Sequence, residues 1–293
     1  MGQVQRQMEV SERRACRTLG QPRATQRAEP IRPDRDKPLV RKLHELSRQH
    51  PRYGYRMIAA SLRREGWNVN RKRIYRLWRQ EGLQVPRKSG KRRRCGNSQN
   101  GCTRRRAEHP NHVWTYDFLY DQTADGRRLK LLAVVDEFTR ECLALEVQRR
   151  MEAQDVLTVL EYLFAVRGAP KYLRSDNGPE FVAGRIRAWL AQHGTGTLFI
   201  APGSPWENAY IESFNSRLRD ELLNTEVFGN LREARVLMED YRLRYNHHRP
   251  HSSLNYATPA AFAATCLPPA PATPPPPEDT STEVVNSLTT PGT

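Results

Sequence analysis

The stretch that decides the fold is residues 113–120, which read Val-Trp-Thr-Tyr-Asp-Phe-Leu-Tyr. Aromatic and β-branched residues alternate along it, which is typical of a β-strand. Its single acid, Asp117, has apolar neighbours, and an ionised carboxylate in such surroundings is costly unless it is paired or bound to a metal. The stretch therefore predicts a strand that carries a chemically important acid.

Strand and helix patterns alternate after this stretch. Residues 129–135 form an apolar run typical of a strand covered on both faces. The residues between them include Ala124-Asp125-Gly126, which predicts a turn. Further on, the pattern predicts strands at 142–147, 172–174 and 197–200, and helices at 153–166, 180–193 and 206–223. Together these elements predict an α/β fold with a mixed five-stranded sheet flanked by helices.

The region before the stretch predicts a small all-helical domain of the helix-turn-helix type. A first helix must end near His50-Pro51, a second ends at Gly66, and Asn70 can cap a third that ends at Gly82. A dense cationic face on the third helix fits a DNA groove, and its residues are Arg71, Lys72, Arg73, Arg76 and Arg79. The alternative is a helical bundle with an ordinary solvated basic face.

The charge is divided unevenly along the 293 residues, whose net charge is +16. Residues 1–110 contain 30 Lys and Arg and 9 Asp and Glu, whereas residues 111–293 contain 18 and 23. A basic first third joined to a mildly acidic remainder predicts a nucleic-acid partner. The chain has no apolar run near the ~18 residues that span a bilayer, so we expect no membrane partner. Five cysteines at irregular spacing favour a reducing cytoplasm.

We expect five segments along the chain. They are a basic N-terminal segment with a partial helix-turn-helix pattern (1–37), the helix-turn-helix DNA-binding domain (38–86), a basic flexible linker (87–110), the α/β core (111–263) and a disordered Pro-rich tail (264–293).

Three acids stand out by position. Asp117 lies inside a strand, Asp176 follows a strand just before Asn-Gly, and Glu212 lies inside a helix with Arg219 two turns further on. Mg²⁺ prefers a few carboxylate oxygens together with water and phosphate, and two such ions can act on one phosphodiester. The pattern alone leaves other acids open, namely Asp136, Glu137, Glu180, Glu207 and Glu221.

Three motifs around these acids resemble those of insertion-sequence transposases of the IS-three family, OrfB type, whose core is similar to retroviral integrases. The motifs are Trp114-Thr115-Tyr116-Asp117, Ser175-Asp176-Asn177-Gly178-Pro179-Glu180-Phe181 and Trp206-Glu207-Asn208-Ala209-Tyr210-Ile211-Glu212-Ser213-Phe214-Asn215. Thirty-five residues separate Asp176 from Glu212, as is usual for this Asp-Asp-Glu triad. Residues 245–260 resemble the closing motif of the family and residues 50–83 its helix-turn-helix module.

The resemblance implies an RNase H-like fold and a transposase that cleaves DNA 3′ ends and transfers strands during DNA integration. Asp117, Asp176 and Glu212 match the three catalytic, metal-binding acids, and Arg219 matches a basic position that contacts DNA. The implied cofactor is Mg²⁺ or Mn²⁺, as two ions. The implied partners are transposon ends, target DNA and further copies of the chain, and the implied location is the bacterial cytoplasm at the nucleoid.

The chain departs from the full family pattern in one respect. Active transposase is usually a frameshift fusion with an upstream OrfA-type product that contributes a leucine-zipper-like coiled coil. Residues 1–37 contain a single leucine and no heptad run, so we expect this chain to be the second frame alone. Two rival interpretations remain: a DNA-binding protein without catalysis, and an RNase H-type nuclease that only hydrolyses.

Overall fold

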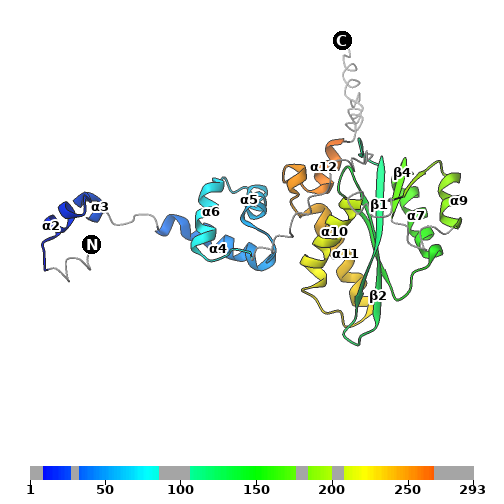
Figure 1. Cartoon of the computed structure of the whole chain (residues 1–293), viewed down its shortest axis with the longest axis horizontal. Helices are drawn as coiled ribbons and strands as arrows, with labels where there is room; N and C mark the ends of the chain where they lie inside the picture. Colours follow the sequence, from blue (N-terminus) through cyan, green and yellow to red (C-terminus); the bar gives the residue numbers. More distant parts are fainter. Residues whose placement is uncertain (1–8, 28–32, 86–105, 176–183, 200–207, 267–293) are drawn as a thin grey trace, which may run out of the picture.

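The computed structural model describes residues 9–27, 33–85, 106–175, 184–199 and 208–266. Its core is a five-stranded sheet with the strand order β3-β2-β1-β4-β5 (Figure 1). The strands are β1 (Val113–Gln122), β2 (Arg128–Asp136), β3 (Cys142–Gln148), β4 (Tyr172–Ser175) and β5 (Gly196–Phe199). The first three form an antiparallel meander, whereas β4 is parallel to β1 and β5 is parallel to β4. This confirms the expected mixed five-stranded sheet.

The sheet is buried on both faces, which explains the apolar run in β2. Every residue of β2 after Arg128 is buried. The turn between β1 and β2 contains Gly126, whose φ of 76° lies in the left-handed region that glycine adopts without steric cost. The expected turn and both strands beside it are therefore confirmed.

Two layers of helices cover the sheet. One face packs against α10 (Ala209–Leu218) and α11 (Leu231–His247), and the other against α7 (Ala153–Arg167) and α9 (Gly184–Gln192). In Figure 1 these two pairs lie on opposite sides of β1. Alternate residues of β1 point to opposite layers, so Leu119 joins the α10 side and Trp114 the α7 side. Asp117 has the same parity as Leu119 and faces the α10 layer.

The C-terminal end of α11 is attached to the edge strand β3. The Asn246 side chain accepts a hydrogen bond from the backbone N–H of Cys142 and donates one to its carbonyl, both at 2.8 Å. After α11 the chain forms a short 3₁₀ helix (Ser252–Leu254) and ends its described part in α12 (Pro259–Cys266). The buried amide of Asn246 thereby fixes where the closing motif begins.

Three helices form a separate small domain before the core: α4 (Pro33–Gln49), α5 (Tyr55–Arg64) and α6 (Arg71–Gln80). Leu43, Ile58, Leu62 and Ile74 are its most buried side chains. The helix α4 begins at Pro33, earlier than the expected start at residue 38. Proline suits the first position of a helix because its missing N–H would have no partner there.

The capped third helix is present as predicted. Asn70 accepts a hydrogen bond from the backbone N–H of Lys72 at 2.8 Å, and Gly82 has a φ of 66° after the last turn. Further upstream, α2 (Glu12–Thr18) and α3 (Arg23–Arg27) are joined by an ion pair between Glu12 and Arg27 at 2.9 Å. Among the described residues, no helix has the length and apolarity needed to cross a membrane.

The helix expected at residues 206–223 differs from the structure. The helix α10 ends at Leu218, and Arg219–Leu223 form a π-helical turn. Trp206 and Glu207 lie outside the described residues. The expected helix is therefore shorter than predicted, and Arg219 begins the π-helical turn rather than continuing α10.

Candidate active site

Asp117 lies midway along β1 on the face covered by α10. It is only partly buried, and its Oδ1 accepts a hydrogen bond from the backbone N–H of Phe118 at 2.8 Å. The partner of Asp117 on β2 is Ala133, which belongs to the buried core. The carboxylate that the sequence singled out is therefore partly accessible although its neighbour on β2 is buried.

A hydrogen bond connects Asp117 to the helix that carries Glu212. The Nδ2 of Asn215 donates to Oδ2 of Asp117 at 2.8 Å. Glu212 is exposed and precedes Asn215 by three residues, so both lie on the same side of α10. The apolar residues Ile211, Phe214 and Leu218 anchor the adjoining side of this helix in the core. Asn215 thus holds the helix of the third acid against the strand of the first.

Asp176 lies outside the described residues, directly after Ser175, the last residue of β4. Paired residues of β1 and β4 differ by 59 in number, as Val113 with Tyr172 and Thr115 with Arg174. Asp117 and Asp176 differ by the same number.

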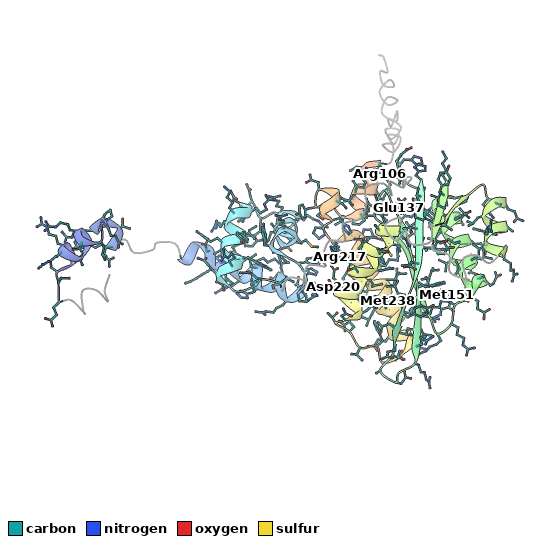
Figure 2. All side chains as sticks on the ribbon, in the orientation of Figure 1. Arg106, Glu137, Met151, Arg217, Asp220 and Met238 are labelled. Atoms are coloured by element: carbon teal, nitrogen blue, oxygen red, sulfur yellow. The ribbon has the colours of Figure 1, made fainter. Side chains whose placement is uncertain are left out.

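Two buried polar contacts fix the elements that carry the acids. The Thr115 hydroxyl donates to Oδ1 of Asn208, the cap residue of α10, at 2.8 Å. On β4, the Arg174 guanidinium forms an ion pair with Glu137 at 2.9 Å, and both side chains are almost fully buried. Figure 2 shows Glu137 near the upper end of the sheet. These contacts tie α10 to β1 and β4 to the end of β2.

The alternative acids have structural partners where they are described. Asp136 is buried and accepts backbone N–H groups from Asn111, Phe138 and Thr139. Burial raises its pKa, and the three hydrogen bonds oppose that rise. Glu221 is paired with Arg249. Glu180 and Glu207 lie outside the described residues.

The donor set suits a hard divalent cation. Asp117 and Glu212 offer carboxylate oxygens, which Mg²⁺ prefers over nitrogen or sulfur. Within the described ranges no cluster of three or more Asp, Glu, His or Cys is placed to hold a metal ion, and the second acid of the triad lies outside those ranges. The residues that could hold a metal are therefore Asp117 and Glu212, with Asp176 as the expected third.

Similarity to known proteins agrees with this arrangement. Residues 107–205 and 193–259 match the family described as integrase core domain, and residues 32–92 match the HTH-like domain. An insertion element IS476 protein of 39.2 kDa from Xanthomonas euvesicatoria is 42% identical over 255 residues, covering 87% of this chain and 73% of the relative. An insertion element IS407 protein of 31.7 kDa from Burkholderia multivorans is 40% identical, covering 90% of this chain and 94% of the relative.

The chain belongs to the IS-three family of insertion-sequence transposases. A putative transposase for the element IS150 of Escherichia coli is 27% identical, covering 79% of this chain and 84% of the relative. The integrase core makes the chain a DDE-type polynucleotidyl transferase with an RNase H-like fold, and its partner is DNA. The expected family, fold class and enzyme class are thereby confirmed.

The basic residues of the transposase fall into two groups. Arg219 begins the π-turn after α10 and is exposed. On α6, Arg71, Lys72 and Arg79 are exposed, whereas Arg73 and Arg76 both form ion pairs with Asp36 of α4. Asp36 therefore orients two of the five predicted DNA-binding side chains and leaves their net charge positive.

The helical domain of the transposase contacts the core next to the π-turn. Arg52 forms an ion pair with Asp220 at 3.2 Å, and the Arg64 guanidinium donates to the carbonyls of His247 and His248, each at 2.9 Å. Beside them, Tyr53 lies against Arg249, with 5.8 Å between the ring centroid and the guanidinium carbon. Sequence reasoning missed these contacts, since they join segments more than 160 residues apart.

His251 of the closing motif is buried beside three cations. Burial is the main cause that lowers its pKa, and together with the positive charges of Arg249, Arg140 and Arg217 it brings the pKa to about 3. The imidazole is therefore neutral in the folded transposase at physiological pH. Its ring packs edge-on against Tyr245, with centroids 4.7 Å apart.

This burial predicts a pH dependence of stability. Below the unfolded pKa of 6.5, the unfolded chain binds a proton at residue 251 that the folded chain does not bind until about pH 3. Stability therefore falls as the pH drops from 6.5, by up to about 1.4 kcal/mol per pH unit from this group. Urea unfolding between pH 7 and 4 should give a steeper loss for the wild type than for His251→Gln. Parallel profiles would mean that His251 titrates normally in the fold.

Proposed function

We propose that this transposase cleaves DNA at the 3′ ends of its insertion sequence and joins the freed 3′-OH groups to target DNA, with Asp117, Asp176 and Glu212 as the catalytic triad. The observation that carries the assignment is the hydrogen bond from Asn215 to Asp117, because it brings the helix of Glu212 to the strand of Asp117. Asp117 and Asp176 differ by 59 in residue number, as do the paired residues of β1 and β4, and this supports Asp176 as the remaining acid of the triad.

The proposed cofactor is Mg²⁺ or Mn²⁺, as two ions held by the three carboxylates. Such ions activate the attacking oxygen and stabilise the leaving oxygen of a phosphodiester. The chain itself supplies the geometry. The side chain of Asn215 and the backbone N–H of Phe118 each donate a hydrogen bond to one oxygen of Asp117. These two bonds fix the plane of its carboxylate. Glu212 stays exposed and accessible to DNA.

The proposal includes an order of events. Water first attacks a phosphodiester at the element end, the bond from phosphorus to the 3′ oxygen breaks, and a 3′-OH and a 5′-phosphate result. The 3′-OH then forms a bond to the phosphorus of a target phosphodiester and releases a 3′-OH of the target strand, so no covalent bond between protein and DNA is needed. Arg219, exposed beyond the end of α10, is proposed to contact the DNA backbone near the reacting phosphate.

DNA binding outside the active site is assigned to the helical domain. Its third helix would lie in a groove, with Arg71, Lys72 and Arg79 exposed for phosphates. The ion pairs of Asp36 would hold Arg73 and Arg76 in a fixed direction. The basic linker at 87–110 would add contacts that do not depend on sequence.

Further partners follow from the family. We propose that the chain acts with an upstream OrfA-type product, as a frameshift fusion, and that several copies assemble on the element ends close to the nucleoid. The division into segments 1–37, 38–86, 87–110, 111–263 and 264–293 is proposed on the same basis.

The test is a strand-transfer assay with a labelled duplex that carries the DNA terminus flanking the gene. The chain is assayed alone and mixed with the upstream product, in both cases with Mg²⁺ and plasmid target. Joined products are expected in at least one mixture. Hydrolysis without joining would favour the RNase H-type nuclease, and binding without either reaction in both mixtures would favour a DNA-binding protein without catalysis.

A further inference from the structure

A cavity of about 380 Å³ lies between the catalytic helix, the closing motif and the helical domain. Its walls include Tyr210, Ser213 and Arg217 from α10, Arg140 from the turn before β3, and Arg52 from the helical domain. Figure 2 shows Arg217 and Asp220 at the side of the core nearest to the helical domain. The cavity is separate from the triad and has no role in the chemistry described above.

The charges lining the cavity do not cancel. Of its four arginines, Arg52 is paired with Asp220 and Arg249 with Glu221. No carboxylate partner for Arg140 or Arg217 occurs in the described part of the chain. His251 adds no charge, since its pKa is lowered by burial to about 3. The cavity therefore presents two uncompensated guanidinium groups.

Arg140 is held in an orientation that suits an anionic ligand. Its guanidinium lies over the Tyr210 ring, with 3.7 Å between its central carbon and the ring centroid. The backbone of Arg140 has a φ of 66°, which is costly for a residue with a side chain. Its Nε and Nη1 atoms are buried and have no hydrogen-bond partner among the described residues. Buried charged donors without an acceptor are expensive, so this arrangement points to an acceptor that the described part of the chain does not provide.

The cavity is close to the reacting acid but lies around the helix from it. Ser213 follows Glu212 directly and is turned by about 100° about the helix axis. Arg217 lies one turn beyond Ser213 on the same side. A DNA strand that places one phosphodiester at Glu212 therefore has neighbouring phosphates within reach of the cavity.

We propose that Arg140 and Arg217 bind a backbone phosphate of the DNA strand, next to the phosphodiester that reacts. This inference rests on the proposed function and adds a second anchoring point for its substrate. Arginine suits the role because its planar fork donates two parallel hydrogen bonds to phosphate oxygens, while its face remains free to stack on Tyr210.

The test measures DNA binding without catalysis. The full chain binds a mixed-sequence DNA duplex in EDTA, and affinity is followed by fluorescence anisotropy at increasing salt. Each lost phosphate contact reduces the slope of log K against log salt by about 0.9. Because both arginines contact the same phosphate, Arg217→Gln and Arg140→Gln should each reduce the slope by up to this amount. Arg232→Gln is the matched control, because Arg232 is exposed on α11 and outside the cavity.

The outcomes are separable. Slopes like that of the wild type in a folded Arg217→Gln variant would overturn the proposal, even if Arg140→Gln fails to fold. A second arm adds inorganic phosphate alone and follows the melting temperature. Stabilisation of the wild type by free phosphate, with unchanged DNA slopes in the variants, would assign the cavity to the free anion and overturn the DNA assignment. Because no cleavage is measured, failure of the triad assignment leaves this result unaffected.

Discussion

Replacement of Asp117 by asparagine is expected to reduce Mg²⁺-dependent cleavage and joining by about three orders of magnitude or more, because a metal-binding carboxylate contributes several kcal/mol to the transition state. The amide is nearly isosteric, so the backbone N–H of Phe118 keeps an acceptor. DNA affinity in EDTA should stay close to that of the wild type. Gel analysis of end cleavage and strand transfer, beside anisotropy, measures both quantities.

A matched control lies on the same strand. Asp121 also accepts a hydrogen bond from the backbone N–H of the next residue, at 2.8 Å. It lies further along β1, opposite Leu129 of β2, and is not one of the three acids of the triad. Asp121→Asn should retain full activity. Unchanged cleavage in Asp117→Asn would contradict the triad assignment. Equal losses of activity in Asp117→Asn and Asp121→Asn would point to a general effect on the strand.

Replacement of Arg249 by methionine is expected to destabilise the core by about 3–5 kcal/mol, because it leaves a buried carboxylate without its partner. Arg249 and Glu221 are joined by three hydrogen bonds, Nη2 to Oε1 at 2.6 Å, Nε to Oε2 at 2.8 Å and Nε to Oε1 at 3.1 Å. Both side chains are about nine-tenths buried. Urea unfolding followed by circular dichroism measures the loss.

The control for this prediction is an exposed pair of the same kind. Arg242 and Glu239 are likewise joined by side-chain hydrogen bonds, two in number, but Glu239 is half exposed. Arg242→Met should cost no more than about 1 kcal/mol. The double variant Glu221→Gln with Arg249→Met should recover part of the loss, since it removes the buried charge. Equal effects of Arg249→Met and Arg242→Met would contradict the role of burial.

Much of the core could be predicted because its signals are local. A strand buried on both faces is apolar throughout, so β2 was recognisable from its own residues. The cap at Asn70 depends on one side chain and the backbone two residues on. The π-turn at Arg219–Leu223 was not predictable, because its residues also suit an ordinary helix, while the ion pairs of Asp220 and Glu221 join them to distant segments.

The site was predictable only in part. Asp117 and Glu212 stood out by position and by the family motifs, and Asn215 could have been found as the residue one turn after Glu212. The contact of Arg140 with Tyr210 joins residues 70 positions apart, and no local pattern indicates it. From the sequence, Asp136 was one of the alternative acids for the metal site. In the structure its carboxylate accepts hydrogen bonds from three backbone N–H groups instead.

The attachment of Asn246 to Cys142 has a consequence for self-association. The strand β3 forms one edge of the sheet, and an open edge is a template on which a strand of another molecule can pair. At Cys142 the donor and the acceptor of the backbone are both occupied by the amide of Asn246. Sheet-to-sheet pairing cannot start at this position, so another copy of the transposase cannot extend the sheet at the first residue of β3.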